Sequence, residues 1–478
     1  MDKQILAVLF TVGLVAGSAF AGNLCLATAQ TGTQISGIMS QDTFWTKANS
    51  PYLLTGAVGV PPGVTLSIEP GVAVYLYSYY IMVNGTLRAK GESSDPVHFN
   101  GGWGGPGTEA LTFEPSGSNY SQQTGTGCII EYAILNETNV SVENVSLRIS
   151  DDTFIYSPIQ IYGASPQVFN NNFFNCGVSM MASIYSPTFA SPVIVNNTVS
   201  NGEIIFGGGT ASAFATISNN SINGGGIGGV GYAYIVDNTI TGCDQGLTLN
   251  TAAVFGGSEP AYPTVERNLI TKNNYGIHIN LFARYEPGTL IPLIINNTIS
   301  QNSVGIYLTE SQYGAAPTIS YNNFENNTNN IYLDQSTPNN VNATYNWWGT
   351  TDNQAINQSI HDYKNDFTLG TVSFIPFLTS PNPQSIPHPN APLQTPIPTF
   401  STTPTLAPTT PAPTPTIPEF PLKPVLSIVL IMASLAIVSV EKMRQTKRTQ
   451  KLSSTNKTRR CTAKESTQTL SIFLLSSL

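Results

Sequence analysis

The chain has 478 residues; 41% of them are hydrophobic and only 10% are charged, with 27 acidic and 19 basic side chains and a formal net charge of −8. This hydrophobic content allows a buried core and excludes a chain that is disordered throughout. The acidic balance argues against nucleic acid as a partner, because phosphate backbones are bound by basic surfaces.

Residues 1–21 are predicted to be a secretory signal peptide. Lys3 precedes an apolar run that begins at Ile5, and the A-F-A string at 19–21 has the pattern of a cleavage site. An N-terminal membrane anchor that is never cut is the alternative. An N-terminal segment, 22–40, follows. The cysteines beyond the signal lie far apart, show no metal-binding spacing and are expected mostly to be buried as small apolar side chains. In the part of the chain that is predicted to be exported they are Cys25, Cys128, Cys176 and Cys243; Cys461 lies in the tail.

A repeat occupies the central part of the chain. One asparagine or aspartate recurs at intervals between 18 residues (220 to 238) and 30 residues (238 to 268), and from the second copy onward an apolar residue stands three positions before it and another stands two positions after it. The copies are Asp152, Asn172, Asn197, Asn220, Asn238, Asn268, Asn297 and Asn322. In four copies a Gly or Asn lies eight positions after this anchor and opens an alternating apolar string. These residues are Gly246, Gly276, Gly305 and Asn330.

The period and the alternation indicate a stack of short strands. Repeats of roughly 20 to 50 residues are typical of solenoids and related arrays. Apolar residues at period two, between turns rich in Gly and Asn, indicate β-strands. No amphipathic helix of about ten residues separates the copies, which excludes ankyrin, tetratricopeptide and ordinary leucine-rich repeats. The sequence therefore predicts an all-β, single-stranded parallel β-helix over residues 41–380.

The anchor residue is expected to have two structural roles. The apolar spacing breaks strict alternation at the anchor, so we expect the chain to bend there in the left-handed conformation that Asn and Gly tolerate. The Gly or Asn eight positions later is expected to form a second bend. Stacked turns place the anchors above one another as a ladder of amide hydrogen bonds. Trp347 and Trp348, near the end of the repeat, are expected to cap the solenoid.

Three segments follow the repeat. Residues 381–420 are rich in Pro and Thr, cannot pack a core, and are predicted to form an extended stalk. Residues 421–441 include an uncharged apolar run near the lower limit for a transmembrane helix; a buried helix of a soluble domain is the alternative. Basic residues open the tail, 442–478, and predict that it is cytoplasmic. The expected localisation is the cell surface, with the N-terminal domain outside and the chain anchored in the membrane.

The string I-x-x-N-x-I…N-x-x-G-I-x-L, found within roughly residues 41–378, resembles right-handed parallel β-helix proteins with short asparagine-anchored repeats. These include β-helix proteins that bind or hydrolyse carbohydrates and the β-helix accessory proteins of nitrous-oxide reductase maturation. The resemblance implies a right-handed fold and gives little information about activity. The IPEFP string at 417–421, before the apolar run and the basic residues, looks like the C-terminal anchoring signal of archaeal surface proteins. The tail here is longer than in that pattern.

No catalytic residue, metal or cofactor is predicted. Asp151 and Asp152 are the adjacent acids of the repeats, and neighbours on a strand point to opposite faces, so they cannot flank one glycosidic bond. Polygalacturonase-like enzymes would also need Gly-His-Gly and Arg-x-Lys motifs. Pectate-lyase-like chemistry would need carboxylates on calcium and a nearby base, and the basic residues are scattered. Copper would need clustered His or Met, whereas the four histidines are isolated.

Two groups of residues are candidates for contact with sugars. A run of four tyrosines is a candidate aromatic platform for a sugar ligand, and simple alternation in and out of a sheet is the alternative. It consists of Tyr75, Tyr77, Tyr79 and Tyr80. Among the many N-x-Ser/Thr sequons, one cluster is the best candidate for surface glycosylation. It consists of Asn136, Asn139 and Asn144.

The favoured function is a non-catalytic cell-surface protein, structural or adhesive, whose partners are glycans or envelope proteins. The alternative is a secreted, membrane-anchored polysaccharide lyase or glycoside hydrolase. Three or more carboxylates that converge with a basic residue in one groove would favour the enzyme.

Overall fold

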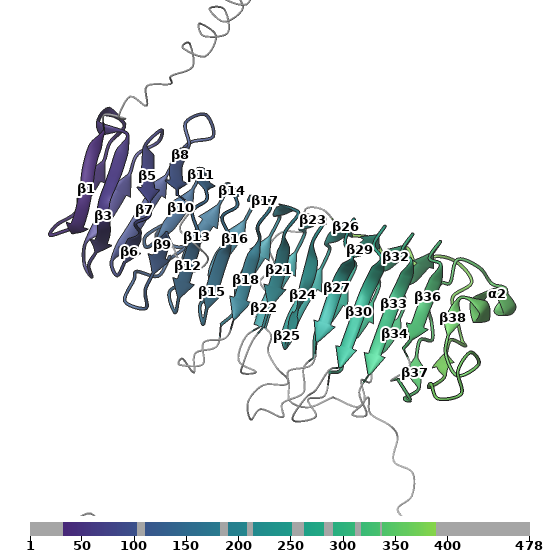
Figure 1. Cartoon of the computed structure of the whole chain (residues 1–478). Coiled ribbons are helices and arrows are strands. Elements are labelled where there is room, and N and C mark those ends of the chain that lie inside the picture. Colours follow the sequence, from purple (N-terminus) through teal and green to yellow (C-terminus); the bar gives the residue numbers. More distant parts are fainter. Residues whose placement is uncertain are drawn as a thin grey trace, which may run out of the picture. The chain divides into compact units, whose positions relative to one another are not determined.

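A computed structural model describes residues 32–102, 110–181, 190–207, 214–250, 262–281, 290–310, 317–334 and 337–388. In these residues the chain is all-β, with short strands paired in parallel in two long sheets (Figure 1). The predicted parallel β-strand repeat is confirmed, and the arrangement is consistent with a β-helix. The predicted signal peptide, transmembrane segment and cytoplasmic tail lie outside the described residues. Among the described residues, no helix has the length and apolar character needed to cross a membrane.

The first sheet contains fourteen strands among the described residues. In stacking order they are β2 (Thr43–Trp45), β4 (Thr65–Ile68), β7 (Thr86–Lys90), β10 (Ile129–Glu131), β13 (Arg148–Ser150), β16 (Gln167–Phe169), β19 (Val193–Val195), β22 (Phe214–Ser218), β25 (Tyr232–Val236), β28 (Thr264–Glu266), β31 (Leu293–Ile295), β34 (Thr318–Ser320), β37 (Val341–Asn342) and β39 (Val372–Ser373).

The second sheet contains two series of strands, which β3 (Tyr52–Val60) joins because it pairs with the first member of each. β1 (Thr33–Ile38) pairs with the other edge of β3. The β5 series comprises β5 (Ala73–Tyr77), β8 (Val97–Gly101), β11 (Ala133–Asn136), β14 (Thr153–Ile155), β17 (Asn172–Phe174), β20 (Thr198–Ser200), β23 (Ser221–Asn223), β26 (Thr239–Thr241), β29 (Leu269–Thr271), β32 (Thr298–Ser300) and β35 (Asn323–Glu325).

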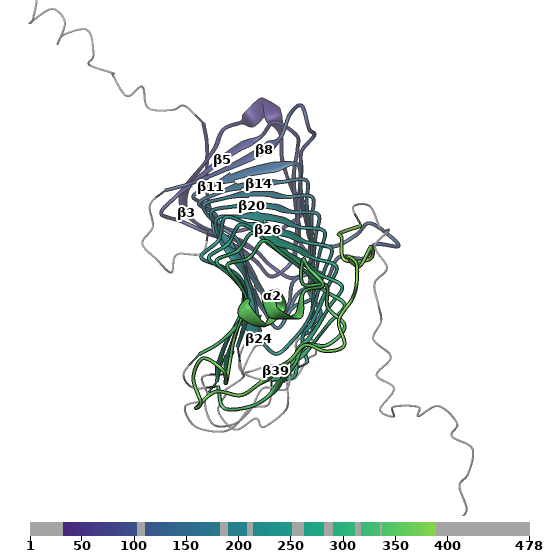
Figure 2. The ribbon, with the colours of Figure 1, turned by 90° about the vertical axis from the view of Figure 1, so that its right-hand side faces the viewer.

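The β6 series comprises β6 (Ile81–Val83), β9 (Leu111–Phe113), β12 (Val140–Glu143), β15 (Ile159–Tyr162), β18 (Val178–Met181), β21 (Glu203–Phe206), β24 (Gly226–Val230), β27 (Gln245–Asn250), β30 (Tyr275–Leu281), β33 (Val304–Glu310), β36 (Asn329–Leu333) and β38 (Ile360–His361). Each complete turn of the chain thus visits the first sheet, the β5 series and the β6 series in that order. Figure 2 shows successive turns lying over one another. Two short helices complete the elements, η1 (Lys47–Asn49) and α2 (Asn353–Gln358).

The interior is filled by residues that hold the same register position in successive turns. In the first sheet one such row is completely buried. It consists of Ile130, Ile149, Val168, Ile194 and Ile217. Burying each of these side chains contributes about 1.5–3 kcal/mol relative to its exposure to water. The β5 series of the second sheet has a similar buried row, in which Ile299 pairs with Phe324. At its C-terminal end the buried Trp348 stacks on Phe324 with ring centroids 4.9 Å apart.

The first bend of each turn lies one residue before the predicted position. Asn196, Asp237 and Asn296 have φ values of 56°, 57° and 56°, and each of them immediately precedes an anchor residue. The anchors themselves, such as Asn197, are buried and do not have a positive φ. The prediction that the anchor itself bends was therefore wrong. Because the anchor side chain must point into the stack to form its hydrogen bonds, the residue before it turns the chain.

One predicted anchor was wrong by one position. Asn172 begins β17 and is exposed, whereas Asn171 is buried and its Nδ2 donates to Asn197 Oδ1 at 3.0 Å. Three consecutive asparagines, beginning at Asn170, stand at this corner, and the apolar spacing alone did not distinguish them.

The predicted second bend also lies elsewhere. Positive φ values occur at Gly242 (69°), Lys272 (59°) and Gln301 (55°), four residues before the predicted glycines. Gly276 instead lies within β30, where an added Cβ atom would sit 2.5 Å from the carbonyl oxygen of Gly305. Glycine is therefore needed there for close stacking of adjacent turns and not for a left-handed turn.

Candidate functional site

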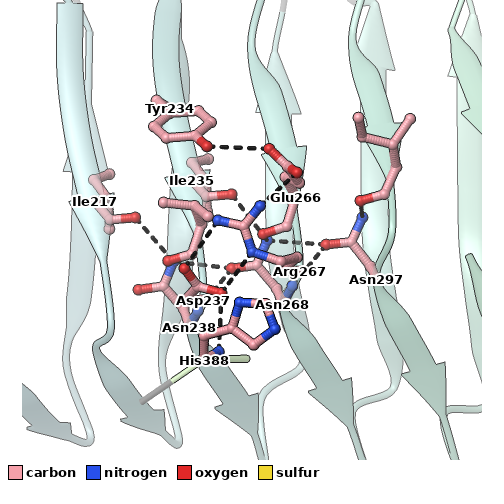
Figure 3. Close-up of polar contacts among 12 residues, drawn as sticks. Ile217, Tyr234, Ile235, Asp237, Asn238, Glu266, Arg267, Asn268, Asn297 and His388 are labelled. Carbon is pink, nitrogen blue, oxygen red and sulfur yellow. Dashed lines mark hydrogen bonds and ion pairs between the residues drawn. The ribbon is translucent and has the colours of Figure 1, made fainter. Parts of the chain in front are cut away.

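The anchor residues form hydrogen bonds along the stack, which accounts for their polarity (Figure 3). Asn238 Nδ2 donates to Asn268 Oδ1 and to the carbonyl oxygen of Ile217, both at 2.9 Å. Asn268 Nδ2 donates in the same way to Asn297 Oδ1 (3.0 Å) and to the carbonyl oxygen of Ile235 (2.9 Å). These buried amides are fully engaged with the backbone and with each other, so they hold the fold and are not accessible to a ligand.

A second hydrogen-bonded row, which was not predicted, follows the first at a distance of five residues. Asn273 Nδ2 donates to Asn302 Oδ1 at 3.1 Å, and Asn302 Nδ2 donates to Asn327 Oδ1 at 3.0 Å. Asn302 and Asn327 stand five positions after Asn297 and Asn322, and this constant spacing is a signal that the sequence contains. This row is also scaffold.

Asp152 occupies an anchor position but differs chemically from its neighbours. Its Oδ1 accepts from the Ala133 amide at 2.6 Å, while its Oδ2 is buried without a hydrogen-bond partner among the described residues. Burial raises the pKa of the Asp152 carboxyl well above its ordinary value, and the charges of Asp151 and Glu131 raise it further. Because Asp152 faces the interior and is completely buried, the pair with Asp151 is not placed to act together on a substrate.

A charged cluster lies at the C-terminal ends of β25 and β28 (Figure 3). Arg267 Nε and Nη2 donate to the two oxygens of Asp237 at 3.0 and 3.1 Å, and Nη1 donates to Glu266 Oε1 at 2.5 Å. The Tyr234 hydroxyl donates to Glu266 Oε2 at 3.0 Å. The hydrogen bond to Asp237 is the main cause that raises the pKa of Arg267. One guanidinium thus engages both carboxylates, with two hydrogen bonds to Asp237 and one to Glu266, which is the geometry of a structural ion pair.

Groups of three or more His, Cys, Asp or Glu side chains able to hold a metal ion do not occur in the described part of the chain. Its three cysteines, Cys128, Cys176 and Cys243, are buried free thiols, and burial raises the pKa of each. Cys25 lies outside the described residues.

The four predicted tyrosines come together at the connection between β5 and β6, which we call the tyrosine turn (Tyr75, Tyr77, Tyr79 and Tyr80). The side chains of Tyr77, Tyr79 and Tyr80 are 47%, 41% and 41% exposed. Tyr75 stacks against Tyr77 with ring centroids 6.1 Å apart. Tyr77 has a φ of 54°, so the chain bends at this residue.

The backbone of the tyrosine turn is held by hydrogen bonds to neighbouring turns. The Val58 amide donates to the carbonyl oxygen of Tyr80 at 3.0 Å, and the Gly102 amide donates to that of Tyr77 at 2.9 Å. The register places Asn100 beside Tyr75, and Asn136 beside Asn100 on the next strand. Exposed aromatic rings on a fixed backbone, next to carboxamide side chains, are the components of a site that stacks on an apolar ring face and hydrogen-bonds its substituents.

An aromatic column on the β6 series, which was not predicted, runs along the outer face of the stack. His278, Tyr307, Tyr332 and His361 are cross-strand neighbours on β30, β33, β36 and β38. Their ring centroids are separated by 5.2, 5.6 and 4.1 Å in that order. The signal lay in the repeat itself, where the strings GIHI, GIYL and NIYL carry a ring between two inward apolar residues.

The polar atoms of His278 and Tyr307 in the column already have hydrogen-bond partners in neighbouring residues. His278 lies 3.0 Å from Gln245 Oε1 through Nδ1 and 2.8 Å from Thr309 Oγ1 through Nε2, and burial lowers its pKa. Burial, followed by the charge of Asp334 and a hydrogen bond to it, raises the pKa of Tyr307 to about 12. All four residues are half-buried, and Tyr332 is stacked against a ring on each side. The column therefore offers less free ring surface for stacking than the tyrosine turn.

The predicted glycosylation sites are only partly accessible. Asn136, Asn139 and Asn144 are all half-buried, and Thr138 and Ser141, the hydroxyl residues of the first two sequons, are buried. Their modification stays a prediction.

Comparison of the chain with protein-family models, with curated proteins and with solved structures found no match. The functional assignment therefore depends on the residues and their geometry.

Proposed function

We propose that this chain is a non-catalytic cell-surface protein that binds glycans through the tyrosine turn. The observation that carries the proposal is the exposure of Tyr77, Tyr79 and Tyr80 on a hydrogen-bonded backbone. Tyrosine side chains have few rotatable bonds, so on a fixed backbone they lose little conformational freedom on binding. Their exposed faces can stack on the apolar face of a sugar ring, while nearby amides hydrogen-bond to its hydroxyl groups.

The proposal includes the arrangement of the whole chain. The fold is a right-handed parallel β-helix, because parallel strands joined by crossovers are right-handed in nearly all proteins and because the repeat resembles that family. A signal peptide (1–21) exports the domain, a Pro/Thr-rich stalk separates it from the membrane, and residues 421–441 anchor it, with the basic tail in the cytoplasm. The IPEFP string supports an archaeal-type surface anchor. The partners are glycans or envelope proteins.

A polysaccharide lyase or glycoside hydrolase is the competing function. Such an enzyme needs two free carboxyl groups at a defined separation, or a base beside a cation. In the Arg267 cluster, Asp237 and Glu266 are both engaged by the guanidinium, so this cluster gives the enzyme no specific support.

A glycan array combined with a polysaccharide degradation screen tests the proposal on the exported chain. The double variant Tyr79→Ala/Tyr80→Ala is expected to bind about tenfold more weakly, a loss of about 1.4 kcal/mol, and to keep the wild-type melting temperature. Tyr156→Ala is the matched control, because Tyr156 is 57% exposed on a different part of the stack. Equal binding by all three proteins would refute the assignment of the tyrosine turn, and degradation of any polymer would refute the non-catalytic function.

A further inference from the structure

Sequons at the corners of the stack share a geometry that the predicted sequon cluster lacks. In the strings Asn196-Asn197-Thr198 and Asn326-Asn327-Thr328, the first asparagine has a φ of 56° in both cases. The first and third residues of both strings are exposed, while the middle asparagine belongs to one of the two hydrogen-bonded rows. The corner therefore turns the acceptor amide and the hydroxyl outward and holds the residue between them in the stack.

The side chains of Asn196 and Asn326 are not engaged elsewhere. Within the described ranges, neither side chain takes part in a hydrogen bond, so both amide nitrogens are accessible. Asn219, at the same corner one turn beyond Asn196, is half-buried and its Oδ1 has no access to water. Sequons at equivalent backbone positions thus differ in accessibility.

A third corner sequon, Asn296-Asn297-Thr298, is covered by a segment that returns along the stack. We call residues 379–388 the strap; they include the start of the predicted stalk. Asn382 Nδ2 donates to Asn296 Oδ1 at 3.0 Å and to the carbonyl oxygen of Tyr321 at 2.6 Å. The hydroxyl of Thr298 donates to the carbonyl oxygen of Ser385, which is completely buried.

The strap continues past this sequon to the Arg267 cluster. The backbone amide of His388 donates to Asp237 Oδ1 at 3.0 Å (Figure 3). At the other end, Asn382 and Asn323 exchange two hydrogen bonds, of 2.7 and 3.0 Å. The strap is therefore fixed on both sides of Asn296, and both the acceptor and the hydroxyl of that sequon are engaged by it.

We propose that Asn196 and Asn326 are N-glycosylation sites, and that the strap protects Asn296 from the same modification. The amide nitrogen of each acceptor forms a bond to the anomeric carbon of a sugar carried on a lipid phosphate. The bond from that carbon to the phosphate oxygen breaks, the lipid phosphate leaves, and the amide proton passes to a base of the transferase. The proposal rests on the export included in the proposed function and is independent of glycan binding by the tyrosine turn.

Peptide mass spectrometry of the full chain, purified from its native cells, tests the assignment site by site. Glycans on Asn196 and Asn326, with Asn296 unmodified, are the expected result. If both Asn196 and Asn326 are unmodified, whether or not Asn136, Asn139 and Asn144 carry glycans, the proposal is overturned. A negative glycan array with Asn196 occupied would reject the proposed binding function and leave this proposal standing.

The strap is tested with Asn382→Ala expressed in the same cells. Loss of the Asn382 side chain is expected to give Asn296 a measurable glycan occupancy, while Gln384→Ala, an exposed residue of the same strap, leaves Asn296 unmodified. Circular dichroism establishes that both variants are folded. A folded Asn382→Ala protein without a glycan on Asn296 would refute protection by the strap, and the site map of the wild-type chain tests the two acceptors independently of any variant.

Discussion

Asp152→Asn is expected to stabilise the protein at neutral pH. The backbone amide of Asp152 donates to Asn171 Oδ1 at 2.9 Å, as expected for an anchor. In the next turn, Asn171 Nδ2 donates to the carbonyl oxygen of Ile149 at 3.1 Å as well as to the following anchor. Ile130 pairs with Ile149, so the corresponding acceptor for residue 152 is the carbonyl oxygen of Ile130. An ionised Asp152 carboxylate can only accept hydrogen bonds, yet both groups at this position, Asn171 Oδ1 and the carbonyl oxygen of Ile130, are also acceptors. The amide group of an asparagine would instead donate one N–H to each of them.

The expected gain in the free energy of unfolding comes from these two hydrogen bonds, and it depends on pH. Two hydrogen bonds to buried acceptors are worth about 1–3 kcal/mol in total. The raised pKa of Asp152 means that the folded state binds the proton more tightly than the unfolded state. The stability contributed by this proton is therefore fully present below the unfolded pKa of about 3.9 and is lost as the pH rises toward the folded pKa. Between these two pKa values, the difference in the free energy of unfolding between the variant and the wild type grows by up to about 1.4 kcal/mol per pH unit.

Calorimetric melting of the wild type and of Asp152→Asn between pH 3 and pH 8 measures this difference. The variant is expected to melt a few degrees higher at pH 7, and the two proteins are expected to converge toward pH 3. Asp151→Asn, which removes the half-exposed carboxyl next to it, is expected to change the melting temperature much less. A variant that melts below the wild type at pH 7, or a difference that does not vary with pH, would contradict the hydrogen-bond reasoning.

Three further predictions use the same scaffold. Asn268→Ala should lower the free energy of unfolding by about 2–5 kcal/mol, because it leaves buried donors and acceptors unpaired in two adjacent turns; the exposed Asn274→Ala is the control in the same denaturation experiment. Gly276→Ala should lower the free energy of unfolding by about 1–3 kcal/mol, because the added Cβ would clash with Gly305. Gly228→Ala is the control and should be tolerated, because the atom nearest to its added Cβ lies at an ordinary 3.6 Å. Comparable melting temperatures for the two alanine variants would argue against this packing. Asp334→Asn should lower the pKa of Tyr307 from about 12, and ultraviolet titration of the phenols against wild type would show no shift if the hydrogen bond is unimportant.

The repeat could be predicted because each turn applies the same physical constraint to the same position. The residue two positions after most predicted anchors, such as Ile240, Ile270 and Ile299, is completely buried, as the apolar spacing predicted. Phe174, two positions after Asn172, is 43% exposed, and the buried ring there is Phe173, two positions after Asn171. The precise anchor was ambiguous only where several asparagines are adjacent, as at 170–172. Spacing identifies a buried polar position, but hydrogen-bond geometry decides which of three amides occupies it.

The strap could not be predicted, because nothing local in its sequence specifies its partners. Asn382 contacts Asn296 across 86 residues, and His388 contacts Asp237 across 151. Its prolines are also typical of an extended stalk, and proline restricts the backbone without indicating what the segment will contact. The aromatic column was not predicted for a different reason: alternation requires apolar side chains at the inward positions, such as Ile277 and Ile279, and sets no requirement on the outward residue between them.

Both proposals concern positions that the stack leaves unconstrained. A turn of this fold requires its inward apolar residues, its two hydrogen-bonded rows and the glycines at which backbones meet. Corner residues with positive φ have to turn the chain; some of them, such as Asp237, are buried, whereas others have exposed side chains. Tyr77 and Asn196 are both such residues, with φ values of 54° and 56°, although one lies in the tyrosine turn and the other in a sequon. Because exposed substitutions of this kind change stability by about 0.5 kcal/mol or less, corner positions can acquire ligand-binding or modified side chains without loss of the fold, which is why we place the function of this chain there.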